Sequence, residues 1–229
     1  MSPDRDRMGA ALGVVGVLGN VVGVTALNGV EGAYRPAGLG AWAESALAHP
    51  GASVASAVAF TVGLLALAGW AATLGRRLGL GGPLAPLAAG AMAVGAVLDA
   101  AGTLLPAVLV LHVAPACAAG ACLAVARALL GVTLSLDALF NLAFGAGLAL
   151  AGWSLWRSGR RPALGGLGIA AGLATIPVAG QLAWEPAARL LAVAGPLWLA
   201  FVLATSVLPW GGRGRAVEEE ELRGVARAC

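Results

Sequence analysis

Six long stretches of this chain carry almost no charge, and they limit what it can fold into. They cover residues 8–27, 52–74, 84–112, 132–156, 163–181 and 190–210, and each holds at most one Asp, Glu, Lys or Arg. An α-helix needs about 20 apolar residues to cross a hydrocarbon core about 30 Å thick. Because lipid leaves backbone polar groups no partner outside the segment, runs of this length predict an all-α, polytopic transmembrane bundle of six spans.

Composition supports a membrane bundle over a soluble fold. Hydrophobic residues make up 59% of the chain and charged residues 11%, whereas soluble domains carry about 25% charged residues. The connections are short, so one bundle over 8–210 takes up nearly the whole chain, with short polar tails at 1–7 and 211–229. No basic patch with interleaved aromatic residues occurs, so we expect no nucleic-acid partner.

The turn WSLWRSGRRP, Trp153 to Pro162, fixes the predicted topology. Trp at the headgroup level, Arg beyond it and Pro at the first position of the next helix are typical of a cytoplasmic turn. Alternation then places 11 arginines inside and three outside, with both termini cytoplasmic. The inside set is Arg5, Arg7, Arg76, Arg77, Arg157, Arg160, Arg161, Arg213, Arg215, Arg223 and Arg227, and the outside set is Arg35, Arg127 and Arg189. We therefore expect a multi-pass protein of the plasma (inner) membrane.

Residues 113–131 are apolar enough to suggest a seventh span. Inserting it would change the arginine split to 6 inside and 8 outside, which the positive-inside rule disfavours. Arg127 and the break at Pro115 instead predict an amphipathic or re-entrant segment on the outer face. Residues 28–51 are too polar to span, and we expect an external loop with a short interfacial helix there.

The span 84–112 is longer than the bilayer requires, so we expect a kink at Pro106. Within this span Asp99 is the first candidate site residue, because it lies near the middle. An aspartate there costs about 2.5 to 3.5 kcal/mol on insertion scales, so it must face the bundle interior, a wet cavity or a partner. Thr103 follows one turn later on the same face. Two roles are open for the Asp99 side chain: it takes part in the function, or it makes a structural hydrogen bond to a neighbouring helix.

A second polar stripe lies near the outer end of the fourth span. Asp137 and Asn141 share a helix face, and Thr133 extends it outward. His112 and Glu185 belong to the same half of the membrane. With Asn28 and Gln181, these side chains could line an outward-facing polar pocket, a hypothesis based on depth alone.

The sequence favours neither a metal site nor a cofactor. His112, Asp137 and Glu185 are ligand types, but they come from separate segments without the close spacing of a zinc motif. Cys117 and Cys122 are expected outside, where a disulfide could persist. Five residues apart in one helix they would point in different directions, which disfavours the bond.

The passage LFNLAFGAGLALAGWSLWRSGRRPALGGLGIAAGL, Leu139 to Leu173, resembles uncharacterised bacterial six-helix membrane proteins of the domain-of-unknown-function kind. In these a span ends in an aromatic residue, a short basic turn follows, and Pro and glycines open the next span. The resemblance covers about 35 of the 229 residues. It implies a bacterial six-helix membrane protein and no site residue.

Two functions remain open at this stage. The favoured one is a non-enzymatic bundle that binds or moves a small apolar or amphipathic molecule, or that scaffolds a membrane-protein partner or a second copy of the chain, with Asp99 as its polar anchor. The alternative is an intramembrane acid–base enzyme, similar to membrane-embedded terpene cyclases, in which Asp99 donates a proton and Asp137 or Glu185 accepts one. A retinal protein is excluded because the chain has no lysine for the Schiff base.

Overall fold

The computed structural model describes residues 3–27, 30, 32–35, 37–79, 83–116, 119–159 and 161–208, and this part is helical and without strands. The α-helices are α1 (Pro3–Ala26), α2 (Leu39–Ala48), α3 (Pro50–Arg77), α4 (Leu84–Thr103), α5 (Leu105–Val108), α6 (Ala119–Arg157), α7 (Pro162–Thr175) and α8 (Leu191–Val207). A π-helical turn (Leu109–Val113) and 3-10 segments (Ala114–Ala116, Ile176–Leu182, Glu185–Leu190) complete the helical elements.

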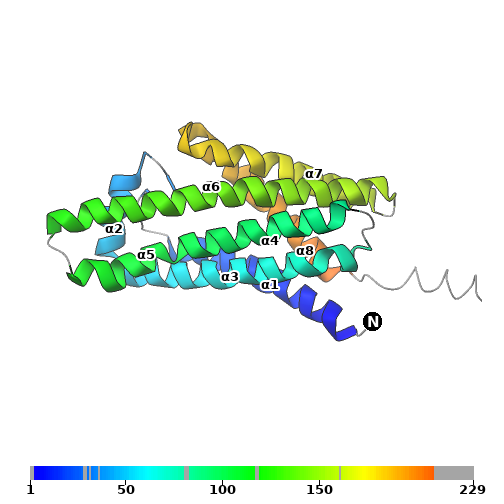
Figure 1. Ribbon diagram of the computed structural model, residues 1–229, viewed down its shortest axis with the longest axis horizontal. Helices are drawn as coiled ribbons and strands as arrows, with labels where there is room; N and C mark the ends of the chain where they lie inside the picture. Colours follow the sequence, from blue (N-terminus) through cyan, green and yellow to red (C-terminus); the bar gives the residue numbers. More distant parts are fainter. Residues whose placement is uncertain are drawn as a thin grey trace, which may run out of the picture.

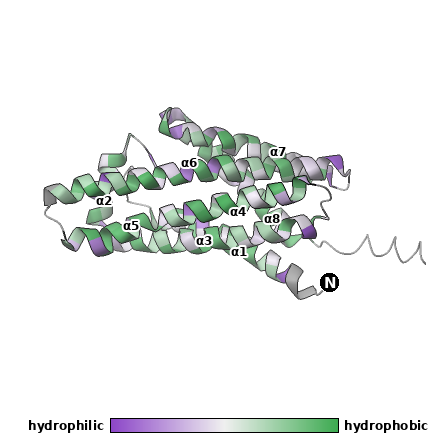
Figure 2. Cartoon of the chain, in the orientation of Figure 1, coloured by the Kyte–Doolittle hydropathy of each residue, from purple (hydrophilic) through white to green (hydrophobic). Residues whose placement is uncertain are grey.

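Six helical segments are long and apolar enough to cross a membrane, which confirms the predicted number of apolar helices and indicates a multi-pass membrane protein. They are Arg7–Ala26, Pro50–Arg77, Leu84–Ala116, Ala121–Arg157, Pro162–Leu182 and Glu185–Val207. Large apolar side chains remain exposed on the outer faces, for example Leu18, Leu65 and Val94, each about half exposed. Figure 2 shows apolar residues along the helices and polar ones mostly toward the ends. An exposed apolar belt of this kind suits contact with lipid.

The helices form a closed ring in chain order. Each of α1, α3, α4, α6 and α7 packs against the next long helix of the series, and α8 closes the ring by contacting α1. We call one end of this bundle the arginine end, because α3 and α6 finish there at Arg77 and Arg157. The opposite end, where the short α2 lies, is the α2 end (Figure 1).

Small residues let neighbouring helices approach closely. A Cβ atom at Gly19 of α1 would lie 2.6 Å from the Cα of Gly63 in α3, closer than any packed side chain allows. This confirms that the glycine-rich face of the first span packs against a neighbour. A Cβ at Gly152 of α6 would lie 2.6 Å from the carbonyl oxygen of Gly165 in α7. Such contacts are typical of membrane helices, which associate through close packing.

The arginine-end half has a dense apolar core with a cluster of aromatic rings. Phe144 stacks on Phe140 at 4.8 Å between ring centroids and meets the Trp198 ring edge-on at 5.7 Å. Trp70 meets Phe201 edge-on at 6.4 Å. Trp70 lies near the end of α3, yet its side chain is fully buried, because it lies on the face of α3 that points into the ring.

The span that contains Asp99 changes its geometry at Pro106, as the sequence predicted for a kink. Proline has no N–H, so the carbonyl of Gly102, four residues earlier, loses its helical donor. The Thr133 hydroxyl of α6 replaces it, at 3.0 Å from the Gly102 oxygen. The helix then continues as α5 and the π-helical turn.

Residues 119–131 form the first turns of α6 instead of a separate segment. The sequence predicted an amphipathic or re-entrant element over 113–131, yet α6 runs without a break from Ala119 to Arg157. No proline follows Pro115 until Pro162, and a single glycine such as Gly131 costs only about 1 kcal/mol in a helix. The helix therefore propagates through the expected boundary.

Cys122 is disulfide-bonded. The other cysteines, Cys117 and Cys229, lie outside the described residues. The prediction about a bond between Cys117 and Cys122 therefore falls partly outside the described residues.

Candidate functional site

The Asp99 side chain lies inside the ring, on α4. It is 5% exposed, and its Oδ1 atom has no hydrogen-bond partner. A buried polar atom without a partner costs about 1 to 3 kcal/mol. This makes Asp99 the least satisfied acid in the described part of the bundle, and it calls for an explanation.

Asp137 lies on α6, which packs closely against α4 one turn from Asp99, where an added Cβ at Gly102 would be 3.0 Å from the Leu136 Cβ. In contrast to Asp99, Asp137 is well bonded. Its Oδ2 atom accepts hydrogen bonds from Asn141 Nδ2 at 3.0 Å and from Gln181 Nε2. Asn141 lies one turn along α6, whereas Gln181 comes from the 3-10 segment Ile176–Leu182. The span that begins with α7 therefore ends as a 3-10 segment, and this segment supplies the Gln181 amide that bonds Asp137.

The threonine hydroxyls on the neighbouring helix turns bond to one another or to backbone carbonyls. The Thr103 Oγ1 atom lies 3.1 Å from Thr61 Oγ1 of α3 and donates to the Ala100 carbonyl. Thr103 makes no hydrogen bond to Asp99, although the two share a face of α4 as the sequence suggested. The Thr133 hydroxyl donates to the Gly102 carbonyl. It therefore stabilises the kink at Pro106 and does not bond the acids.

Tyr34 approaches the acids from the segment between α1 and α2. Its backbone φ of 57° lies in the left-handed region, which costs about 1 kcal/mol or more for a residue with a side chain. Its ring lies 5.0 Å from the Trp42 ring and 5.8 Å from the Phe60 ring. Burial raises the pKa of the Tyr34 hydroxyl well above its ordinary value, and the charges of Asp99 and Asp137 raise it further.

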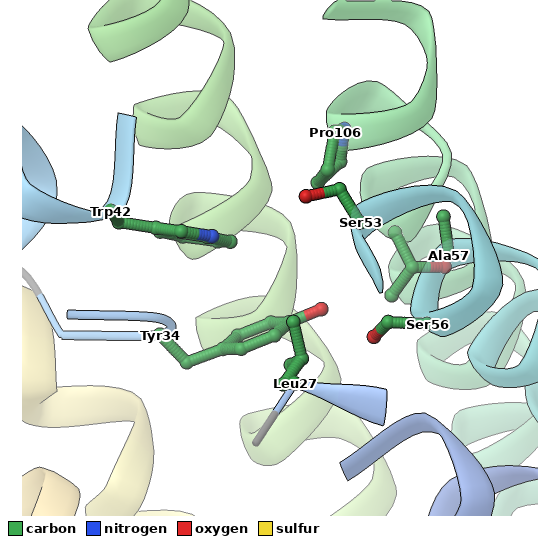
Figure 3. A pocket seen from close by; sticks show the side chains of 8 residues that line it. Leu27, Tyr34, Trp42, Ser53, Ser56, Ala57 and Pro106 are labelled. Atoms are coloured by element: carbon green, nitrogen blue, oxygen red, sulfur yellow. The ribbon is translucent and has the colours of Figure 1, made fainter. Parts of the chain in front are cut away.

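A small pocket lies beside these residues (Figure 3). It is lined by Leu27, Tyr34, Trp42, Ser53, Ser56, Ala57, Thr103 and Pro106. The Tyr34 hydroxyl points into it, and the Trp42 ring covers one side. Its interior has room for about one water molecule. Thr103, one turn from Asp99, is the lining residue that connects the pocket to the acids.

We call Tyr34, Asp99, Thr103, Asp137, Asn141 and Gln181 the polar cluster. Irregular helix surrounds it: the break at Leu104, the π-helical turn Leu109–Val113 and the 3-10 segment Ile176–Leu182. π-Helical turns are frequent at functional sites, and interrupted membrane helices recur around binding sites of transporters. The arginine end also has buried polar side chains, namely Thr73, Arg77, Thr205 and Ser206, but they lie on regular helices, and Arg77 Nη2 donates to the Ser206 carbonyl at 3.2 Å.

The cluster contains four of the six predicted site residues, Asp99, Thr103, Asp137 and Asn141, together with Gln181. His112 and Glu185 are exposed and lie outside it. His112 is directed outward because the π-helical turn buries Leu109 and Val110 instead, and Glu185 begins a surface 3-10 segment. Asn28 lies outside the described residues.

The sequence did not assign Tyr34, Trp42 or Thr61 to the site. Tyr34 and Trp42 belong to a segment interpreted as an external loop with an interfacial helix, and α2 does form there, but with Trp42 only 1% exposed. The glycines on both sides of Tyr34, Gly29, Gly32 and Gly38, are a turn signal. That signal could have suggested that the chain folds back onto the bundle.

Within the part of the chain that the structure describes, no group of three or more His, Cys, Asp or Glu side chains is placed to hold a metal ion. No family model, no curated protein and no solved structure matches this chain. The function is therefore argued from the polar cluster itself.

Proposed function

We propose that this protein is a binding bundle of the plasma membrane, which holds the polar group of a small amphipathic molecule at the polar cluster. Asp99 is the anchor, and the arginine end with both termini faces the cytoplasm. The observation that carries the proposal is the buried Asp99 Oδ1 atom without a partner. A ligand that supplies a hydrogen bond there removes a penalty that the protein otherwise bears.

The surroundings of Asp99 suit a ligand with one polar end. The hydroxyls of Ser53, Ser56 and Tyr34 line one part of the pocket, and Leu27 and Pro106 line another. Convergent polar groups within mostly apolar walls are typical of small-molecule sites. Because the pocket has room for about one water, only the polar group enters it in this conformation.

An acid–base enzyme of the terpene-cyclase kind has less support. The Phe144, Trp198 and Phe201 rings could stabilise a carbocation, but they pack in the arginine-end half, away from the pocket beside Asp99. A pocket for one water also leaves no space beside the acid for an isoprenoid chain. Binding therefore agrees better with the geometry than turnover does.

The test is mass spectrometry of small molecules that copurify with the protein in mild detergent. We expect one enriched compound in the wild type that disappears with Asp99→Leu, which removes the polar anchor. Glu44→Leu is the matched control, because it removes an exposed acid of α2 at the same end of the bundle. The variants are first compared by gel filtration and melting temperature, so that loss of the fold is recognised.

If only bulk lipid copurifies with all three proteins, the binding proposal is wrong. A compound that persists in folded Asp99→Leu would also contradict it, because the polar anchor would then be dispensable. The Asp99→Asn variant tests separately whether binding needs the negative charge of Asp99.

A further inference from the structure

The polar cluster combines two acids with no basic partner. Neither Asp99 nor Asp137 has an ion pair among the described residues. The arginine of α6 nearest along the chain, Arg127, instead lies against Gly40 of α2, where its guanidinium would be 3.2 Å from an added Cβ. Two N–H donors nevertheless bond the Asp137 carboxyl, and such donors stabilise a carboxylate. The cluster is therefore suited to negative charge but has no positive charge of its own.

Three of the four hydroxyls around the pocket, all except that of Tyr34, have already used their hydrogens. Ser53 donates to the Ala46 carbonyl at 3.4 Å, and Ser56 donates to the Gly23 carbonyl at 3.0 Å. Thr103 donates to the Ala100 carbonyl at 3.1 Å. A hydroxyl has one hydrogen and two acceptor lone pairs, so these three groups present lone pairs to a ligand.

The two side-chain amides of the polar cluster also donate to groups within the cluster. The Asn141 and Gln181 NH₂ groups both bond Asp137 Oδ2, and Asn141 Nδ2 also donates to the Asp137 carbonyl at 2.8 Å. The site therefore offers many acceptors and few donors. It favours a ligand that brings positive charge or N–H groups, and it disfavours a carboxylate or a phosphate.

Aromatic rings add a second feature that favours a cation. The Tyr34 and Trp42 rings lie 5.0 Å apart and both line the pocket. A cation within about 6 Å of such a ring gains about 0.5 to 2 kcal/mol, with Trp the strongest partner. The protein maintains Tyr34 in a left-handed conformation at this position, and strained residues of this kind cluster at ligand-binding sites.

We propose that the ligand is a cationic amphiphile, whose protonated primary amine enters the pocket lined by the Tyr34 and Trp42 rings, with the Asp99–Asp137 pair as its counter-charge. This inference rests on the proposed binding function and specifies its ligand class. The cation neutralises the acid pair, and its apolar chain remains outside the pocket, which has room for about one water.

The experiment uses the full chain in dodecyl maltoside, a neutral detergent, with two added probes of equal chain length. Dodecylammonium carries a positive charge at neutral pH, and dodecanoate carries a negative one. We expect the cation to raise the melting temperature of the wild type and dodecanoate to leave it unchanged. Asp99→Asn, which keeps the shape but removes one acid, should weaken cation binding at least tenfold, while Glu44→Gln should bind like the wild type.

Tyr34 supplies a second readout, because it is the only tyrosine of the chain. Tyrosinate absorbance therefore reports this side chain alone. A cation bound beside the ring favours the negative tyrosinate, so saturating dodecylammonium should move the onset of the Tyr34 titration to lower pH in the wild type. The shift should be absent in Asp99→Asn. A general effect of the surfactant on the fold would move both proteins equally.

Equal stabilisation by both probes, or undiminished cation binding and an unchanged titration shift in folded Asp99→Asn, would overturn the cation assignment. The binding proposal itself would stand in that case if a copurifying compound still depends on Asp99. If no compound copurifies and neither probe binds, both proposals are wrong.

Discussion

The two halves of the bundle differ in helix regularity and in the side chains of their interior, although the same helices run through both. At the arginine end, regular helices pack aromatic and aliphatic side chains, including Trp70, Phe144 and Phe201, into a fully buried core. At the α2 end, the helices break, two acids enter the interior, and Tyr34 adopts a left-handed conformation. The arginine-end half therefore contributes close apolar packing, and the α2-end half is where we propose that the ligand binds. Substitutions in the two halves should therefore separate stability from binding.

The largest effect is expected from Phe144→Ala. Phe144 is fully buried and contacts two other rings, and a Phe→Ala change in a core costs about 3 to 5 kcal/mol. We expect about 3 kcal/mol, because lipid is already apolar and mainly packing is lost. Unfolding in sodium dodecyl sulfate measures it. Leu142→Ala, at an exposed position, is the control, and an equal loss there would contradict a special role of the aromatic core.

The second-largest loss of stability is expected from a substitution where two helices pack closely. Gly19→Leu places a side chain where a Cβ would already be 2.6 Å from the Gly63 Cα, and overpacking of this kind costs about 1 to 3 kcal/mol. A Cβ at Gly131 of α6 would meet nothing within 4 Å, so Gly131→Ala should be neutral or stabilising by up to about 1 kcal/mol. Thermal unfolding of the two variants tests whether the α1–α3 contact is as tight as described. Equal melting temperatures would contradict it.

A moderate loss is expected for Asp137→Leu in the α2-end half. This change leaves the Gln181 NH₂ group without its acceptor and leaves Asn141 Nδ2 only the backbone carbonyl of residue 137, and a buried unsatisfied group costs about 1 to 3 kcal/mol. Asp137→Asn retains an acceptor oxygen and should lose less. Denaturant unfolding of both variants measures the difference. If the Leu variant were as stable as the wild type, the amides would have other partners.

Features that depend on residues close together in the sequence could be predicted, and features that depend on contacts between distant segments could not. Apolar length and arginine placement are local, so the six apolar helices and the break at Pro106 were predicted. The meeting of Asp99, Asp137 and Gln181 depends on the order of helices in the ring, which sequence distance does not encode. The polar segment around Tyr34 was placed outside on composition, because no pattern within it reports that its rings are buried against Phe60 and Trp42.

Tyr34→Phe should have the smallest effect, and one that depends on pH. The ring contacts with Trp42 and Phe60 remain, so we expect a change within about 0.5 kcal/mol at neutral pH. The pKa of Tyr34 is raised in the folded protein, first by burial and then by the charges of Asp99 and Asp137. The unfolded chain therefore loses this proton first as the pH rises above about 10.

The sign of the pH effect follows from that order of proton loss. The folded wild type binds one proton more than the unfolded chain above about pH 10, so its stability is unchanged below that pH and falls above it, by at most about 1.4 kcal/mol per pH unit. Tyr34→Phe has no such proton, so its melting temperature should decrease less between pH 9 and pH 11. Parallel curves for the two proteins would mean that Tyr34 is solvated in the folded state. In that case the α2-end half would be an open surface and not a buried site.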